Sequence, residues 1–265
     1  MGPPWRTIFG LAILTACVCP AQITPTHSLR IQLPPEVKSE TFFGRYTLSG
    51  QDMGGWVQPR PGVDVYSVDT MERGRPAGGI KALLWAQGCA VQAMDMSLLG
   101  QTQADYRFVC RPVPAITITG KLRCTGNNCG KGLRLQARYV ARWARDFLAL
   151  SSDMVPVIPV GGATIQSDDG SFTIAVPDLA RDPVAGAANH DGELQVWARE
   201  PVGDAVPALV VPESPANIKT RMGGMKLMSE YPAGIVFSIC PTGPAMKHDR
   251  DGFAIRPPAS DVCSQ

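Results

Sequence analysis

The sequence has little of what nucleic-acid surfaces and most enzyme sites are built from. It holds three histidines in 265 residues, aromatic residues make up 7% of the chain, and the formal net charge is +2. A charge so close to neutral gives no basic field for nucleic acid and no sign of an acidic substrate. We therefore expect no nucleic-acid partner.

Catalytic motifs are missing as well. No histidine lies four residues from another, which removes the HExxH frame of zinc hydrolases. Neither Ser49 nor Ser171 stands in the Gly-x-Ser-x-Gly elbow of serine hydrolases, and Gly120-Lys121 lacks the spacing of a phosphate loop. We expect no catalytic residue, no metal and no cofactor. A hydrolase remains the third hypothesis, because the two acids of a glycosidase can be distant in sequence.

The few residues that could make a site have ordinary surroundings. His27 is expected in a mobile N-terminal stretch, and His190 and His248 in polar surface turns. Trp56 follows Gly54-Gly55 in a predicted loop, where its ring could stack on a sugar or tuck back onto the sheet edge. The tucked form is favoured, and Trp56 is a weak ligand-binding candidate.

Long apolar runs are absent too. The stretch from Thr7 to Val18 falls short of the roughly 20 apolar residues of a membrane span. With Arg6 before it and Cys19-Pro20-Ala21 after it, this stretch predicts a signal peptide over residues 1–21. The mature chain is then secreted or periplasmic and has no transmembrane helix. Leu14-Thr15-Ala16-Cys17 leaves an alternative open, a lipoprotein anchored through Cys17.

Of the eight cysteines, six remain after cleavage at Ala21, an even number that suits disulfides outside the cytosol. Six cysteines allow 15 pairings. A zinc site would need CxxC pairs or interspersed histidines, and the chain has neither. Proximity in the sequence predicts three bridges, namely Cys89–Cys110, Cys124–Cys129 and Cys240–Cys263.

Glycine (27 residues) and proline (24) are abundant without a collagen-like period, which indicates many turns between short strands. Residues 28–113 predict an antiparallel β-sandwich. Leu29 to Leu33 alternates as a half-buried strand should. The other strands expected here are Phe42–Leu48, Val63–Val68, Ile80–Ala86, Ala90–Met94 and Tyr106–Cys110.

A second unit is expected over residues 114–200. Its ambiguous segment is Leu133–Trp143, where three arginines four residues apart suggest a helical face. Every odd position of the segment is apolar, however, and a strand explains all of them. We predict a strand. The others expected are Ile116–Leu122, Val157–Ile165, Phe172–Val176 and Leu194–Ala198.

One family resemblance covers residues 115–200. The order is Thr119-Gly120-Lys121-Leu122, the long alternating strand, the turn Asp168-Asp169-Gly170-Ser171-Phe172, Val176-Pro177-Asp178-Leu179, and the strand from Gly192 to Ala198. This order resembles the carboxypeptidase regulatory-like domain, a transthyretin-like β-sandwich that serves as an accessory module in exported bacterial proteins. The resemblance implies a sandwich fold and a non-catalytic role.

Residues 201–265 are proline-rich, with strand-like runs at Pro207–Val211 and Ile235–Cys240. They form a C-terminal extension or a partial β unit, and the sequence does not decide between these. The predicted fold is all-β, two antiparallel Ig- or transthyretin-like sandwiches in series with this extension. The first functional hypothesis is a non-enzymatic exported binding or scaffold protein of the cell envelope or secreted fraction. Its partner would be an envelope protein or polysaccharide, and a carbohydrate-binding module is the alternative.

Overall fold

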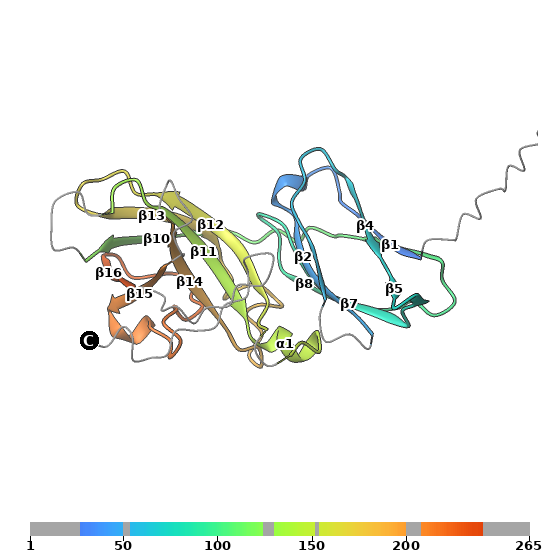
Figure 1. Ribbon diagram of the computed structural model, residues 1–265. Helices are drawn as coiled ribbons and strands as arrows, with labels where there is room; N and C mark the ends of the chain where they lie inside the picture. The colour runs from blue at the N-terminus through green and yellow to red at the C-terminus, as the bar shows by residue number, and fades with distance from the viewer. Residues whose placement is uncertain (1–26, 50–53, 124–129, 152–153, 200–207, 241–265) are drawn as a thin grey trace, which may run out of the picture.

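The computed structural model describes residues 27–49, 54–123, 130–151, 154–199 and 208–240 (Figure 1). The predicted signal peptide, the lipidation alternative at Cys17, and His248 lie outside these residues. The described chain is all-β, as predicted, with one short helix, α1 (Trp143–Phe147), and two 3-10 turns, η1 (Ser39–Thr41) and η2 (Ala216–Ile218). The strands are β1 (Ser28–Gln32), β2 (Phe43–Leu48), β3 (Gly55–Val57), β4 (Val65–Asp69), β5 (Met71–Glu72), β6 (Arg75–Pro76), β7 (Gly79–Trp85), β8 (Gln92–Ser97), β9 (Gln103–Arg107), β10 (Ala115–Leu122), β11 (Arg134–Ala141), β12 (Val157–Thr164), β13 (Ser171–Pro177), β14 (Gly192–Arg199), β15 (Ala208–Ser214) and β16 (Ile235–Cys240).

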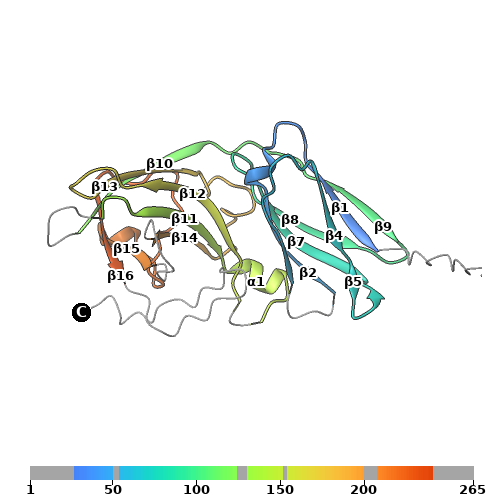
Figure 2. The same cartoon turned by 45° about the horizontal axis from the view of Figure 1, so that its top comes forward.

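The N-terminal part, residues 27–113, is built mainly from two sheets that face each other (Figures 1 and 2), with β5 and β6 as a separate small pair. One has the strand order β4-β1-β9 and the other β3-β2-β7-β8. Leu29 and Ile31 of β1 are buried, as the alternation in the sequence predicts. Together with Phe42, Leu84 and Phe108 they belong to the N-terminal core between the two sheets.

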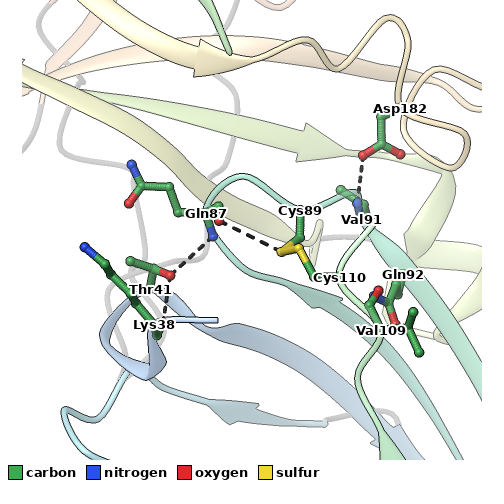
Figure 3. The surroundings of a disulfide bond; sticks show 9 residues. All are labelled: Lys38, Thr41, Gln87, Cys89, Val91, Gln92, Val109, Cys110 and Asp182. Atoms are coloured by element: carbon green, nitrogen blue, oxygen red, sulfur yellow. Dashed lines mark hydrogen bonds between the residues drawn. A yellow bond between two sulfur atoms is a disulfide. The ribbon is translucent and has the colours of Figure 1, made fainter. Parts of the chain in front are cut away.

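A disulfide between Cys89 and Cys110 closes the N-terminal part, as predicted (Figure 3). Cys89 also forms an isolated bridge with Pro112, so the segments after β7 and β9 are held together by backbone as well as by sulfur. Cys124, Cys129 and Cys263 lie outside the described residues, and of Cys240 only the backbone is described. The other two bridges stay predictions.

The C-terminal part, the described residues from 114 to 240, is one curled sheet of seven strands in the order β12-β11-β14-β15-β16-β10-β13. β15 and β16 come from the proline-rich stretch that the sequence left undecided, and they complete this sheet. β16 pairs with β10 in parallel and with β15 antiparallel. The C-terminal core inside the sheet includes Ile118, Tyr139, Ile174, Leu194 and Phe237.

The strand predicted over residues 133–143 is confirmed for β11, and the prediction is wrong at its end. Trp143 begins α1 instead of extending the strand. The last pair of the β11–β14 ladder is Ala141 with Gly192, and the Trp143 N–H then donates to Asp191 O at 3.1 Å. With no further partner strand to follow, the chain turns into one helical turn, which ends where Ala149 has a φ of 51°.

The N-terminal and C-terminal parts pack against each other through the four-stranded sheet. Alternate residues of β2 and β7 face opposite ways, so that Phe42 and Leu84 enter the N-terminal core while Phe43, Leu83 and Trp85 enter the C-terminal core. Figure 2 shows α1 beside β2 and β7. The two middle strands of this sheet, β2 and β7, are therefore covered on both faces, whereas the edge strand β8 exposes alternate residues. The division of the chain into units at residues 113 and 200 stays a prediction.

Side-chain hydrogen bonds between described residues cross between the parts. Arg45 Nη2 donates to the sulfur of Met154 at 3.7 Å. Thr47 Oγ1 donates to Leu148 O at 2.8 Å just beyond α1, and Val91 N donates to Asp182 Oδ2 at 2.7 Å (Figure 3). Asp182 also accepts hydrogen bonds from the N–H groups of Val184 and Ala185, at 2.8 and 2.9 Å. One buried carboxylate thus organises its own turn and holds the neighbouring sheet to it.

Candidate functional site

Trp56, the ligand-binding candidate of the sequence, lies in a strand and not in a loop. It belongs to β3, which pairs with β2, so the expected loop is wrong at this point. Gly55 allows the pairing, because a Cβ there would lie 2.2 Å from the Tyr46 hydroxyl oxygen.

The indole of Trp56 is half-buried at the edge of the C-terminal core. Its centroid is 5.1 Å from that of Phe43, and the Arg45 guanidinium lies over the ring at 4.3 Å. These contacts match the arrangement in which the ring lies back against the sheet edge. Arg45 covers one face of the ring. The ligand-binding role of Trp56 stays a prediction.

A groove of about 560 Å³ lies instead on the C-terminal sheet, where β10 and β13 run beside the end of β12. Its lining comes from three strands and two connections that are distant in sequence. Most of the side chains are hydroxyls or amides, and two positions are glycine. The lining residues are Thr119, Gly120, Lys121, Thr164, Gln166, Ser167, Ser171, Phe172, Thr173 and Gly234.

The turn between β12 and β13 forms one wall of the groove, and Asp169 organises it. Asp169 Oδ1 accepts hydrogen bonds from Ser167 Oγ at 2.8 Å and Ser171 N at 3.0 Å, while Oδ2 accepts from Ser171 Oγ at 2.9 Å and Lys121 Nζ at 3.0 Å. Gly170 completes the turn with a φ of 78°, a conformation that favours glycine. The Asp-Gly-Ser sequence therefore encodes a rigid wall.

The same hydrogen bonds keep the Asp169 carboxylate in its charged form. Donation from Ser167, Lys121 and Ser171 to the carboxylate holds the pKa of Asp169 well below its usual value. Asp168 is paired with Lys131 at 2.7 Å. Both carboxylates of this turn thus have an ammonium partner, and the turn itself carries no net charge.

Four polar side chains that line the groove make no hydrogen bond to the part of the chain that the structure describes. They are Thr119 on β10, Thr173 opposite it on β13, and Thr164 and Gln166 at the end of β12. Thr119 and Thr173 are direct register partners, so their side chains stand side by side. Three hydroxyls and one amide are available there to donate and accept.

A second polar cluster is buried on the face of β14 that points away from the C-terminal core. Glu193, with no exposed side-chain surface, accepts hydrogen bonds from Arg142 Nη2 at 2.6 Å, from Gln195 Nε2 at 2.7 Å and from Thr220 Oγ1. Gly224 N donates in turn to Thr220 Oγ1 at 3.0 Å. These bonds hold the segment after β15 onto β14, which is a structural role.

The sequence did not reveal this buried cluster. Alternation along Gly192–Ala198 shows that Glu193 and Gln195 share one face, but it does not show that the segment after β15 covers that face. For the groove, the sequence did single out two wall segments, residues 119–122 and the turn at residues 168–172, but not that they meet in one concave surface.

Two histidines are more ordered than expected. His27 is not in a mobile stretch, since its Nδ1 lies 3.1 Å from Gln101 O and its carbonyl accepts a bond from Thr70 N. His190 is half-buried and stacks on Trp143, with ring centroids 3.9 Å apart and planes 6° from parallel. Trp143 Nε1 donates to the hydroxyl of Tyr139, whose pKa is raised above its usual value by burial. These contacts are structural.

Within the described ranges, no three histidine, cysteine, aspartate or glutamate side chains gather as metal ligands would. In the same ranges no helix is long and apolar enough to cross a membrane.

Comparisons with known proteins give distant likenesses. No family model and no curated protein matches the chain. A "putative carbohydrate binding protein" from Bacteroides uniformis is 12% identical over 66% of this chain and 90% of its own, with a TM-score of 0.25. A "putative adhesin" from Bacteroides ovatus is 7% identical over 86% of this chain and 91% of its own, with a TM-score of 0.23. At these TM-scores neither likeness supports an argument about function.

Proposed function

We propose that this chain is an exported, non-enzymatic binding protein and that the hydroxyl-lined groove is its binding surface. The Cys89–Cys110 disulfide supports export, because such bonds persist in oxidising compartments. The signal peptide predicted over residues 1–21 points the same way. The accessory-module role that the resemblance implies fits a binding function, and membership of the carboxypeptidase regulatory-like family stays part of the proposal.

The observation that carries the proposal is that four exposed polar side chains gather in one concave surface without hydrogen bonds to the described part of the chain. A groove of about 560 Å³ is within the range of roughly 300–1,000 Å³ that small-molecule sites occupy. Thr119, Thr164, Gln166 and Thr173 present donors and acceptors, and the turn at Asp169 keeps one wall rigid. The groove is thus suited to an uncharged polar ligand.

The same geometry supports a non-enzymatic role. A glycosidase needs one carboxyl group that is protonated at working pH and can donate a proton. Asp169 is held in its charged form by Ser167, Lys121 and Ser171, and Asp168 is paired with Lys131. The pKa of Asp169 is lowered, whereas a general acid requires a raised one.

The test is a ligand screen of the oxidised, exported protein by protein-observed NMR, with Thr119→Val and Thr173→Val as groove variants. Thr117→Val is the matched control, because Thr117 is exposed on β10 two residues before Thr119 and does not line the groove. We expect ligand-induced shifts at residues lining the groove, weakened in both groove variants and unchanged in the control. Shifts that map elsewhere and persist in both groove variants would overturn the proposal.

A further inference from the structure

The direction of the backbone along β13 matters for what the groove can bind. In an antiparallel pair, residues whose N–H and C=O both point to the partner alternate with residues whose groups point away. Gly170 O accepts from Leu122 N at 3.1 Å, and Asp178 N donates to Pro114 O at 2.8 Å, both in the register of the β10–β13 ladder. The even-numbered residues of β13 therefore bond to β10, and the odd-numbered ones turn their N–H and C=O groups away from it.

Two of these outward-facing residues are covered. Ser171 N donates to Asp169 Oδ1, and Ser171 O lies 3.0 Å from Ser167 Oγ. Ala175 O faces β12 so closely that a Cβ on Gly161 would lie 2.3 Å from it. Both ends of the free edge of β13 are thus closed by other parts of the chain.

Thr173 lies between them, and its outward groups point toward β12, as the carbonyl of Ala175 does. Its backbone N–H and C=O point away from β10, and β12 and β13 form no ladder among the described residues. Thr173 also lines the groove. The backbone donor and acceptor of Thr173 therefore belong to a residue of the groove wall and form no bond to β10.

We propose that the groove binds a neutral saccharide of one or two rings, held at its centre by the backbone N–H and C=O of Thr173. This inference rests on the proposed binding role and names its ligand class. A sugar ring offers adjacent hydroxyls that donate and accept at once, which matches the paired donor and acceptor of Thr173 and the hydroxyls of Thr119 and Thr164. Within the lining itself, the ammonium group of Lys121 is paired with Asp169, which disfavours an anionic ligand at that wall.

An extended peptide is the rival ligand for a strand edge, and the geometry disfavours it. Strand addition draws its affinity from several successive backbone hydrogen bonds along an open edge. On β13 the positions on either side of Thr173 are already covered, at Ser171 by Asp169 and at Ala175 by Gly161. An added peptide strand could form one pair of hydrogen bonds with Thr173, and it could not continue its pairing with β13 on either side. A compact ring needs no more than that one pair.

The experiment is a titration of the ¹⁵N-labelled, oxidised protein followed by amide chemical shifts. The probes are cellobiose, maltose, lactose and N,N′-diacetylchitobiose as neutral sugars, a sulfated heparin disaccharide as an anion, and a threonine- and valine-rich hexapeptide as a strand. We expect at least one neutral sugar to shift the Thr173 amide most, with smaller shifts at Thr119 and Gln166. The anion and the peptide should leave these amides in place.

Thr173→Val removes the hydroxyl and keeps the N–H, whereas Thr173→Pro removes the N–H and breaks no bond to β10. Each variant should weaken sugar binding about tenfold, the effect of one lost hydrogen bond. Thr117→Val should bind as the parent does. If Thr173→Pro does not fold, the Thr173 amide shift and the Thr173→Val titration decide.

The outcomes separate the ligand class from the binding role. If the peptide or the anion shifts the amides of the groove and no sugar does, the saccharide proposal is overturned and the proposed binding role is kept. Sugar binding that leaves the Thr173 amide unmoved would overturn the role of its backbone. Sugar-induced shifts confined to residues outside the groove would overturn both proposals.

Discussion

Replacing Asp182 tests whether one buried carboxylate holds the N-terminal and C-terminal parts together. Asp182 is 2% exposed and accepts three backbone hydrogen bonds, from Val91, Val184 and Ala185. An Asp182→Ala variant leaves these N–H groups without their acceptor, and a buried donor without a partner costs about 1–3 kcal/mol. Because the Val184 N–H is only partly buried and can be hydrated, we expect the free energy of unfolding to fall by about 3–5 kcal/mol.

The assay is urea denaturation of the oxidised protein, followed by both tryptophan fluorescence and circular dichroism. Asp182→Asn is the matched variant, because its side-chain oxygen can still accept from Val184 and Ala185 while its amide faces the Val91 N–H. It should lose about 1–3 kcal/mol, the cost of the one unsatisfied donor. If the two parts unfold as one, both probes will report a single transition. A loss below about 1 kcal/mol for Asp182→Ala would refute the reasoning, and separate transitions would show that the shared packing is weak.

Three further predictions concern the scaffold. Replacing both cysteines of the described disulfide by serine should lower the free energy of unfolding by about 3 kcal/mol in urea titrations, the chain-entropy cost for a separation of 21 residues. Gly161→Ala places a Cβ 2.3 Å from Ala175 O and should cost about 1–3 kcal/mol, whereas Gly78→Ala, with its nearest neighbour at 3.6 Å, should cost clearly less in the same assay. Burial raises the pKa of Tyr139, so the folded state favours the neutral side chain. This contribution to stability is complete below the unfolded pKa of about 10 and is lost as pH rises beyond it. Unfolding measured from pH 8 to 11 should show this loss, and the Tyr139→Phe variant should show a weaker dependence on pH.

Local periodicity was enough to predict most strands and one disulfide. Alternation identified β11 against a competing helical pattern, because every inward position from Leu135 to Ala141 is apolar. Closeness in sequence identified Cys89–Cys110, since both cysteines follow strands that end at the same place. These features depend on residues near each other along the chain.

The groove and the buried cluster could not be predicted in that way. A periodic pattern shows which side chains share a face, but not which strands become neighbours. Thr119 and Gly234 meet because β10 pairs with β16 in parallel, and no local signal encodes that pairing. Glu193 is buried because a distant segment covers it. Trp143 left its predicted strand for a similar reason, since its partner strand ends at Gly192.

The burial of β2 and β7 on both faces has a mechanical consequence. β1 lies at one end of the molecule and the groove on β10 and β13 at the other, with the β2–β7 sheet and α1 between them (Figures 1 and 2). Because Phe43, Leu83 and Trp85 are part of the C-terminal core, this middle sheet cannot swing like a hinge without exposing them. The packing of this middle sheet therefore keeps the groove at a fixed distance from β1.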